Sequence, residues 1–195
     1  MMYPWRGEFT IGSPNSQIAI DTLSSKMNFP PELVAIWGQH KTENLGVEKI
    51  IANVVSNPNI RYLILCGQEV RGHRSGQSLR ALHSDGIDGN GRIIGARGAV
   101  PYIENVSAEA IARFREQVEL VDMIGTDDLG IVLEKVKELS AARKEPFGEP
   151  IIMEFVERDK SSRMKSLTGK ISIHKDLLVD PYMEVEIMNT EAEQC

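Results

Sequence analysis

The stretch LILCGQEVRGHRSGQSLRALHSDG, residues 63–86, joins a continuous apolar run to a polar segment with helical spacing. The apolar run predicts a strand that is covered on both faces, as in a parallel sheet. The following segment predicts a helix, and His73 lies near its start, between Gly72 and Gly76. Because glycines lack side-chain bulk, a broad, flat group has room to approach this backbone. By position alone, His73 fits a ligand-binding role and an ordinary helix-start role equally well.

The alternation of apolar runs and helical segments continues along the chain. Short apolar runs predict strands at residues 17–23, 33–38, 61–67, 118–125 and 149–157, and at the start of residues 92–103. Apolar residues at helical spacing predict helices at residues 45–56, 72–84, 107–118 and from Asp127 or Asp128 onward, with Ser107 as one cap. This order indicates an α/β fold with an open, mainly parallel sheet and helices on both faces.

The length of 195 residues allows one compact domain with a small addition. Residues 1–157 carry the alternating elements, whereas residues 158–170 are polar and basic and predict a linker. Residues 171–174 and 182–188 alternate apolar and polar side chains, which predicts a small C-terminal β-hairpin. We therefore expect an α/β domain at 1–157, followed by a polar linker and C-terminal extension at 158–195.

The composition argues against several classes of protein. A net charge of −6 disfavours a nucleic-acid partner, because proteins that bind the phosphate backbone concentrate Lys and Arg. Two cysteines, Cys66 and Cys195, are too few for a disulfide framework or a cysteine-based zinc site, and they fit a reducing cytoplasm. The sequence has no apolar run of about 20 residues, the length of a membrane helix. We expect a cytoplasmic protein with no membrane segment of its own.

Three polar or glycine-rich loops follow predicted strands, where ligands bind in open parallel sheets. Thr42, Glu43 and Asn44 precede one helix, which is also the pattern of an ordinary helix cap. Residues 95–105 combine small side chains with Arg97, which favours a tight loop or a site for an acidic group. Each loop is weak evidence alone, but together with the His73 loop they predict a site at one edge of the sheet.

Other motifs fail on spacing. Residues 85–91 resemble a calcium loop but lack ligands at required positions. The glycines of residues 89–95 do not have the dinucleotide-binding spacing, and no phosphate-binding loop motif occurs. His40, His83 and His174 are too scattered for a zinc-ligand pattern.

Three blocks of sequence closely resemble a known family. TENLGVEKIIANVVSNPNIRYLILCGQEVRGHRSGQSLRALHSDGID, GRIIGARGAVPYIENV and RFREQVELVDMI are similar to the A-subunit family of tetrahydromethanopterin S-methyltransferase, within a resemblance that spans residues 12–137. That family supplies the corrinoid-binding polypeptide of a methanogen methyltransferase complex. The resemblance implies a Rossmann-like α/β domain that binds a cobamide, either cobalamin or a 5-hydroxybenzimidazolyl analogue. It also implies that His73, in the family motif G-H-x-x-G-Q at residues 72–77, is the lower axial ligand to cobalt.

The resemblance implies a methyl relay within the one-carbon metabolism of methanogenesis. The cobalt would carry a methyl group from a donor such as methyl-tetrahydromethanopterin, or a related pterin, to an acceptor thiol or a second methyltransferase. His73 is then the expected catalytic residue and metal ligand, and partner methyltransferase subunits are implied. Neutral imidazole is a suitable nitrogen donor to cobalt, and we expect Glu69 or a backbone carbonyl to orient its other nitrogen.

The expected cofactor-binding residues lie in the three loops described above. Small side chains there give the corrin disc room, and polar ones meet its amide substituents. With His73, they are Gly67, Glu69, Gly72, Gly76, Gln77, Thr42, Glu43, Asn44, Gly95, Ala96, Arg97, Gly98, Ala99, Pro101, Glu104 and Asn105.

Two features depart from related patterns. The more widespread corrinoid motif D-x-H-x-x-G has aspartate where this chain has Arg71. Residues 158–195 replace the C-terminal membrane helix of the family's complex-bound members, so we expect a soluble relative that works with another donor or acceptor methyltransferase. Two alternatives stay open: a cofactor-free interaction or scaffold member of the family, and a flavin- or nucleotide-binding α/β protein, which the missing phosphate-loop spacing disfavours.

Overall fold

The computed structural model describes residues 2–70 and 72–154, together with four short strands at 163–165, 172–174, 177–179 and 185–187. The chain divides into two compact units, Met1–Phe155 and Val156–Cys195. Within the described residues, no helix is long and apolar enough to cross a membrane.

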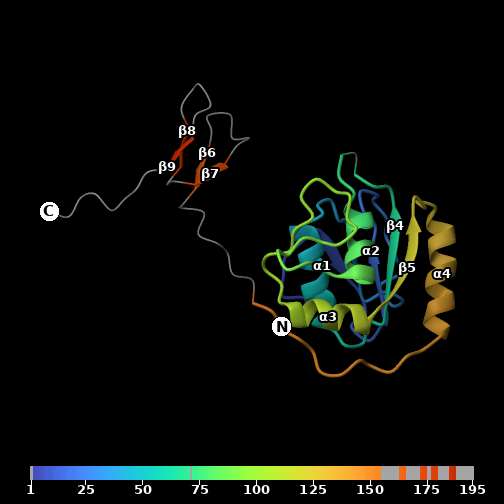
Figure 1. Ribbon diagram of the computed structural model, residues 1–195. Helices are drawn as coiled ribbons and strands as arrows, with labels where there is room; N and C mark the ends of the chain where they lie inside the picture. The colour runs from blue at the N-terminus through green and yellow to red at the C-terminus, as the bar shows by residue number, and fades with distance from the viewer. Residues whose placement is uncertain are drawn as a thin grey trace. The chain divides into compact units, whose positions relative to one another are not determined.

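The first unit is built on a mixed five-stranded sheet (Figure 1). In spatial order its strands are β1 (Phe9–Ile11), β3 (Ile36–Gly38), β2 (Ile18–Asp21), β4 (Tyr62–Gly67) and β5 (Glu119–Ile124). The four strands β2 to β5 are parallel, and β1 pairs antiparallel with β3 at the edge. The prediction of an open, mainly parallel sheet is confirmed.

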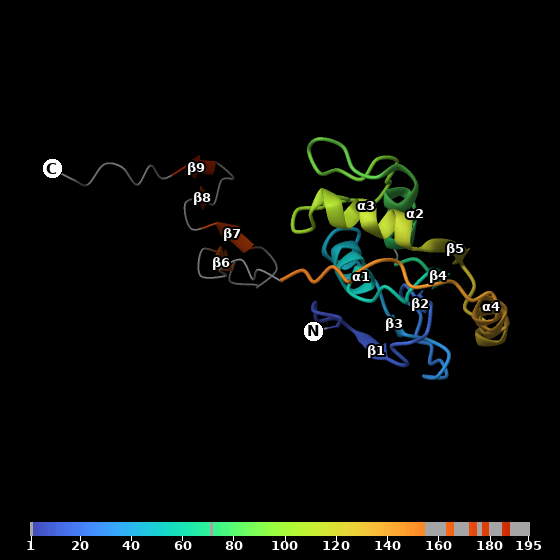
Figure 2. The ribbon, with the colours of Figure 1, turned by 90° about the horizontal axis from the view of Figure 1, so that it is seen from below.

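Helices cover both faces of this sheet, as predicted. In Figure 2, α1 (Leu45–Val55), α2 (Ser75–Asp85) and α3 (Ala108–Gln117) lie on one side and α4 (Leu129–Ala141) on the other. The first turns of two helices are stabilised by cap side chains that lie next to them in the sequence. The Ser107 side chain accepts the amide of Ala110, and the Asp128 side chain accepts the amides of Gly130 and Ile131.

The burial of strand β4 on both faces of the sheet explains why its sequence is continuously apolar. All six of its residues are buried. Since successive side chains point to opposite faces, Leu63 and Leu65 join the apolar cluster under α1, α2 and α3, whereas Ile64 and Cys66 join the cluster under α4. Burial raises the pKa of the Cys66 thiol to about 12, with the charge of Asp21 adding to the shift, so this thiol stays protonated.

Two predicted strands of the first unit are wrong. Residues 92–103 form only isolated bridges, between Ile87 and Ile93 and between Arg92 and Tyr102. Residues 149–154 form no strand, and residues 155–157 lie outside the described residues. Ile151 and Met153 pack beside the cluster under α1, α2 and α3. Their apolar character therefore covers the core without extending the sheet.

The second unit contains strands where a hairpin is predicted, but the predicted pairing is wrong. Strand β7 (Ser172–His174) pairs antiparallel with β6 (Arg163–Lys165), which lies within the predicted linker. Strand β9 (Val185–Ile187) pairs antiparallel with β8 (Leu177–Val179). The apolar run 177–179 forms a strand of its own, so the two predicted arms each have a different neighbour.

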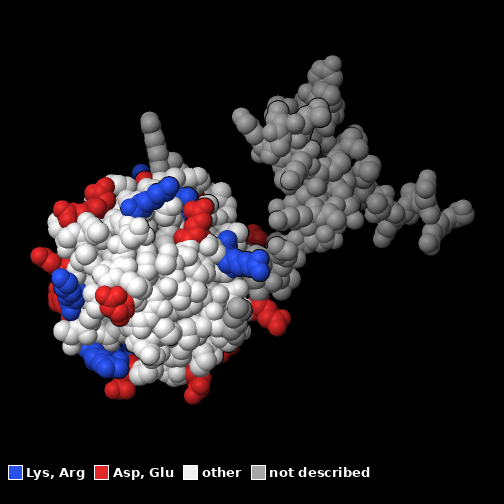
Figure 3. Space-filling model, turned by 180° about the vertical axis from the view of Figure 1, so that it is seen from behind, with Lys and Arg blue, Asp and Glu red and all other residues white. Residues whose placement is uncertain are grey.

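Charged side chains are dispersed on one face of the first unit. On the face shown in Figure 3, Lys and Arg side chains lie in small groups, separated by Asp and Glu and by a broad uncharged area.

Gly67, the last residue of β4, allows a test of the close contact between this strand end and the loop after β2. Gly67 has φ of +81°, and a Cβ there would lie 2.2 Å from the carbonyl oxygen of Thr22. We expect Gly67→Ala to lower the free energy of unfolding by at least about 2 kcal/mol, because it combines a left-handed backbone with a backbone clash. Urea denaturation measures this loss. The control, Gly89→Ala, adds a Cβ with nothing within 4 Å and is expected to change little; equal losses in both variants would contradict the argument.

Candidate functional site

The candidate site lies at the carboxyl edge of the parallel strands. Strand β2 has β3 on one side and β4 on the other, so the order of connection reverses between β2 and β4. Ligands of open α/β sheets bind outside the carboxyl ends at such a reversal. The loops after β2 and β4 touch there, since the Ser24 amide donates to the Gln68 carbonyl at 3.0 Å. The His73 loop continues from this contact.

A buried carboxylate joins the three loops that the sequence indicates. Nδ1 of His73 lies 2.8 Å from Oε2 of Glu43, and Oε1 of Glu43 accepts the Val100 amide at 3.0 Å. The Glu43 side chain is 2% exposed and that of His73 is 46% exposed. The structure therefore places His73 at a rim, with Nδ1 held by a buried carboxylate.

The surroundings of Glu43 favour its charged form. Burial alone would raise the pKa of this carboxyl, but the Val100 amide, backbone amides nearby and His73 outweigh it, so the pKa of Glu43 is lowered. Since an ionised carboxylate can only accept, Nδ1 of His73 is the donor of their hydrogen bond, and Nε2 is the ring nitrogen left for another partner. Gly98 packs against this carboxylate, because a Cβ there would lie 2.8 Å from Cγ of Glu43.

Glu69 has a different role from the one predicted. Its two carboxylate oxygens accept the amides of Gly76 and Gln77, at 3.1 and 2.8 Å, in the first turn of α2. Glu69 thus caps the helix that follows His73, and Glu43 orients the imidazole. The prediction relied on closeness in the sequence, since Glu69 is only four residues from His73. The actual partner of the imidazole, Glu43, comes from another loop.

The helix α2 is also tied to the loop of residues 95–101. The Gln77 side-chain amide donates to the Gly95 carbonyl at 3.0 Å, and its oxygen accepts the Arg97 amide at 2.8 Å. The Arg97 side chain and Ala99 are exposed, whereas Ala96 and Pro101 are buried. This loop therefore stands beside His73 with its backbone fixed at two places, by Gln77 and by Glu43.

The remaining predicted site residues differ in the contacts that hold them in place. A Cβ on Gly72, whose φ is +83°, would meet nothing within 4 Å. Asn44 stands at the N-cap of α1 without a side-chain cap bond, and Oγ1 of Thr42 accepts the Gly46 amide at 3.0 Å. The Glu104 and Asn105 amides are held by buried Glu48, at 2.5 and 2.8 Å. These last two residues are therefore anchored to α1 through a carboxylate other than Glu43.

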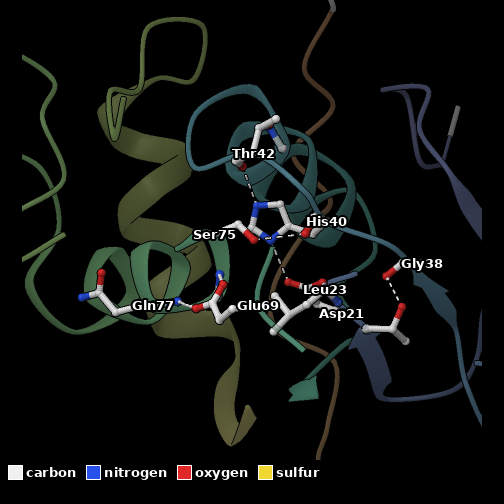
Figure 4. Close-up of polar contacts among 11 residues, drawn as sticks. Asp21, Leu23, Gly38, His40, Thr42, Glu69, Ser75 and Gln77 are labelled. Atoms are coloured by element: carbon white, nitrogen blue, oxygen red, sulfur yellow. Dashed lines mark hydrogen bonds and ion pairs between the residues drawn. The ribbon is translucent and has the colours of Figure 1, made fainter. Parts of the chain in front are cut away.

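A second histidine–carboxylate pair, which the sequence analysis missed, lies buried beneath these loops (Figure 4). Nδ1 of His40 donates to Oδ2 of Asp21 at 2.8 Å, and Nε2 donates to the Thr42 carbonyl at 2.7 Å. The Ser75 hydroxyl donates to the His40 carbonyl at 3.1 Å. His40 thus connects the end of β2, the loop that carries Glu43 and the first turn of α2.

The partners of His40 require its charged form, since both ring nitrogens face acceptors. Burial alone would lower the pKa of His40, but the charge and hydrogen bond of Asp21, the Thr42 carbonyl and the charge of Glu69 outweigh it, so the pKa is raised. The signal in the sequence is the pair of polar residues at the carboxyl ends of neighbouring strands, with Asp21 the last residue of β2 and His40 two residues after β3.

Two of the cavities among the described residues lie at the edge of the sheet formed by β1 and β3. One of about 340 Å³ lies between β3, α1 and the N-terminal segment, and its walls include Thr42 and His40. A second, of about 420 Å³, lies across Trp37 and Gly38 from the first. Neither is lined by His73 or Glu43. Among the described residues there is also no cluster of three or more His, Cys, Asp or Glu side chains placed to hold a metal ion.

Comparison with known proteins identifies the family. The family model for the A subunit of tetrahydromethanopterin S-methyltransferase matches residues 2–163. This match covers most of the chain and includes all three loops of the candidate site. The chain belongs to the tetrahydromethanopterin S-methyltransferase A-subunit family. The resemblance seen in the sequence is confirmed.

Curated relatives of this A-subunit family agree. The A subunit of the putative methyltransferase Mtx of Methanosarcina barkeri (strain Fusaro / DSM 804) is 45% identical over 90% of this chain and 88% of its own length. The tetrahydromethanopterin S-methyltransferase A subunit of Methanohalophilus mahii is 39% identical over 90% of this chain and 76% of its own. The corresponding A 2 subunit of Methanothermobacter marburgensis is 52% identical over 68% of this chain and 73% of its own.

The buried pair in this A-subunit family member gives a pH-dependent prediction. Because the pKa of His40 is raised on folding, its contribution to stability is complete below its ordinary pKa of about 6.5 and declines as the pH rises through the folded pKa. Removing His40 also leaves Asp21 as an unpaired buried charge, a loss of about 3–5 kcal/mol. We therefore expect the difference in unfolding free energy between wild type and His40→Gln to fall as the pH rises above about 6.5, where Asp21 is ionised and His40 loses its proton.

Urea denaturation across a pH series measures this difference. The control is His83→Gln, since the His83 ring bonds the Val118 carbonyl at 2.8 Å and not a carboxylate. Its stability difference is expected to be smaller and to vary less with pH. A His40 difference that grows as the pH rises would contradict the charge assignment.

Proposed function

We propose that this chain is a corrinoid-binding methyl carrier in which His73 is the axial ligand to cobalt. The observation that carries the proposal is the pair between exposed His73 and buried Glu43, 2.8 Å apart. A carboxylate that holds one imidazole nitrogen fixes the ring and its tautomer, which is the usual arrangement behind a metal-binding histidine. The corrinoid-binding unit is proposed to be residues 1–157, with residues 158–195 as an extension.

The residues present fit a cobamide. A single imidazole suits a metal whose other ligands come from a macrocycle, because only the axial position needs a protein donor. His73 lies at a rim, and a Cβ added to Gly72 would meet nothing within 4 Å. A corrin ring is much wider than an amino-acid side chain, so it needs an uncrowded surface of this kind.

The loops around His73 supply the rest of the proposed site. Thr42, Glu43 and Asn44 come from one side, and residues 95–105 from the other, with Arg97 exposed. When bound, the cobamide would supply a cobalt that accepts and releases a methyl group. The chain's own part is to hold the ring, to present Nε2 and to keep the Nδ1 proton on the side of Glu43.

Donor, acceptor and partners are inferred from the relatives. Relatives are named subunits of tetrahydromethanopterin S-methyltransferase, so we propose a methylated tetrahydromethanopterin or a related pterin as donor and a thiol or second methyltransferase as acceptor. Partner methyltransferase subunits would bring these substrates to the His73 rim.

A cofactor-free interaction or scaffold role is the alternative. The observation that favours it is the position of the two cavities, which lie away from His73. The two functions differ in one measurable property, since only a methyl carrier must retain a cobamide at micromolar concentration.

Reconstitution with hydroxocobalamin tests the axial ligand. We expect the wild-type protein to retain the cobamide and to change its visible absorption spectrum, and His73→Ala to lose that change because Nε2 is gone. His83→Ala, which removes a histidine of α2 that contacts Val118, is the control and should behave as wild type. Identical spectra for wild type and His73→Ala would contradict axial ligation, and a wild type that retains no cobamide would favour the scaffold role.

Replacing the carboxylate tests how His73 is positioned. Glu43→Gln keeps the size of the side chain but removes the charge that holds the Nδ1 proton. We expect it to bind hydroxocobalamin about 10–100-fold more weakly, as for other partners of metal-binding histidines. Nitrogen NMR of the cofactor-free protein should show a weaker preference for the Nδ1–H tautomer of His73. The control is Glu119→Gln, whose carboxylate pairs with Lys144; no difference between the two variants would count against Glu43.

A further inference from the structure

Two cavities flank the edge of the sheet formed by β1 and β3. The first, of about 340 Å³, lies between these strands and α1, and the second, of about 420 Å³, opens beside Lys26 and Met27. Six residues line both: Gly7, Glu8, Phe9, Trp37, Gly38 and Gln39. The two cavities therefore share one wall, and we refer to them together as the β1–β3 pocket.

The first cavity of the β1–β3 pocket has mainly apolar walls. Strand and helix side chains supply them, and these are Phe9, Ile36, Leu45, Ile50, Val54 and Leu63. Volumes of about 300–1,000 Å³ with apolar walls and a few polar groups are typical of small-molecule sites. The pocket is thus large enough for a fused pair of aromatic rings or a comparable apolar body.

The charges at the pocket are mostly positive. Lys41 and Lys49 line the first cavity, Lys26 lines the second, and Glu8 lines both. Nζ of Lys41 pairs with Glu8 at 2.7 Å, whereas Lys26 and Lys49 have no ion pair within the described part of the chain.

The titration of Glu8 supports the convergence of these lysines. The hydrogen bond and charge of Lys41 lower the pKa of Glu8 most, and the charges of Lys26 and Lys49 lower it further. Asp21 and His40 also line the first cavity, but they pair with each other at 2.8 Å. Among the described residues, one ammonium group without an ion pair is therefore left at each of the two cavities, which share Glu8, in a chain whose net charge is −6.

We propose that the β1–β3 pocket binds an amphiphilic anion, a small molecule with an aromatic or otherwise apolar body and a carboxylate, sulfonate or phosphate group. The body lies against the apolar walls, and Lys26 and Lys49 meet the anionic group at the mouth. The site is separate from the His73 rim, because neither His73 nor Glu43 lines it. The inference does not rest on cobamide binding.

Two probes with the same aromatic body separate the contributions of charge and burial. Anilinonaphthalene sulfonate carries an anionic group, and N-phenylnaphthylamine does not. We expect fluorescence titration of the full chain, without cofactor, to show saturable binding of both, with the sulfonate tighter. Lys26→Gln combined with Lys49→Gln should weaken the sulfonate about 5–20-fold and leave the neutral probe unchanged. Lys144→Gln is the control, since Lys144 pairs with Glu119 elsewhere.

A matched pair of leucines tests the location. Leu45, 38% exposed, begins α1 at the pocket, and Leu129, 40% exposed, begins α4 on the other face of the sheet. Aspartate is favourable in the first turn of a helix, so both variants should fold. Leu45→Asp is expected to abolish binding of both probes, and Leu129→Asp to retain it.

Several outcomes would overturn the proposal. Equal affinity for the two probes, or no effect of the lysine changes, would show that the site does not recognise an anionic group. Unchanged binding in Leu45→Asp would show that the probes do not bind in the β1–β3 pocket. Calorimetric displacement of the sulfonate by saturating hydroxocobalamin would show that the pocket belongs to a cobamide site, and failure of hydroxocobalamin to bind at all would count against His73 ligation while leaving the pocket standing.

Discussion

The arrangement at the edge of the sheet depends on the buried carboxylate of Glu43. A buried charge is costly unless hydrogen-bond donors surround it. Here the donors come from His73 and from Val100, so Glu43 fixes two loops that are distant in the sequence relative to its own. Gly98 packs so closely against the same side chain that a Cβ there would lie 2.8 Å from Cγ of Glu43, so a larger residue would disturb the loop of residues 95–101.

The pair of His40 and Asp21 supports this arrangement from below. His40 bonds the carbonyl of Thr42, the residue next to Glu43, and its own carbonyl accepts the hydroxyl of Ser75, two residues after His73. The two histidine–carboxylate pairs differ in exposure, with the inner one fully buried and the outer one half exposed on its imidazole. The inner pair therefore acts as a rigid support, and only the outer imidazole is free to meet a ligand.

The proposed functions divide the carboxyl edge into two regions. At the rim, an oriented imidazole among small and polar residues fits the axial ligand of a macrocycle. Beside it, between β1, β3 and α1, an apolar pocket with lysines at its mouth fits a smaller anion. The regions meet at residues 40–42, where His40, Lys41 and Thr42 line the pocket and lead directly to Glu43.

The amino-acid pattern was enough to predict an open, mainly parallel sheet, helices on both of its faces, the cap at Ser107 and the family, but it left the cap of α4 open between Asp127 and Asp128 and did not predict the edge strand β1. Local spacing and side-chain type control the predicted features, so a single chain segment is enough to reveal them. It also indicated the three loops, including both members of the pair formed by His73 and Glu43. It did not indicate that they pair, nor the role of Glu69 as a cap, the buried pair of Asp21 and His40, or the failure of residues 92–103 and 149–154 to join the sheet. These became visible only in the folded chain, because they depend on which side-chain and backbone donors and acceptors the fold brings within hydrogen-bonding distance.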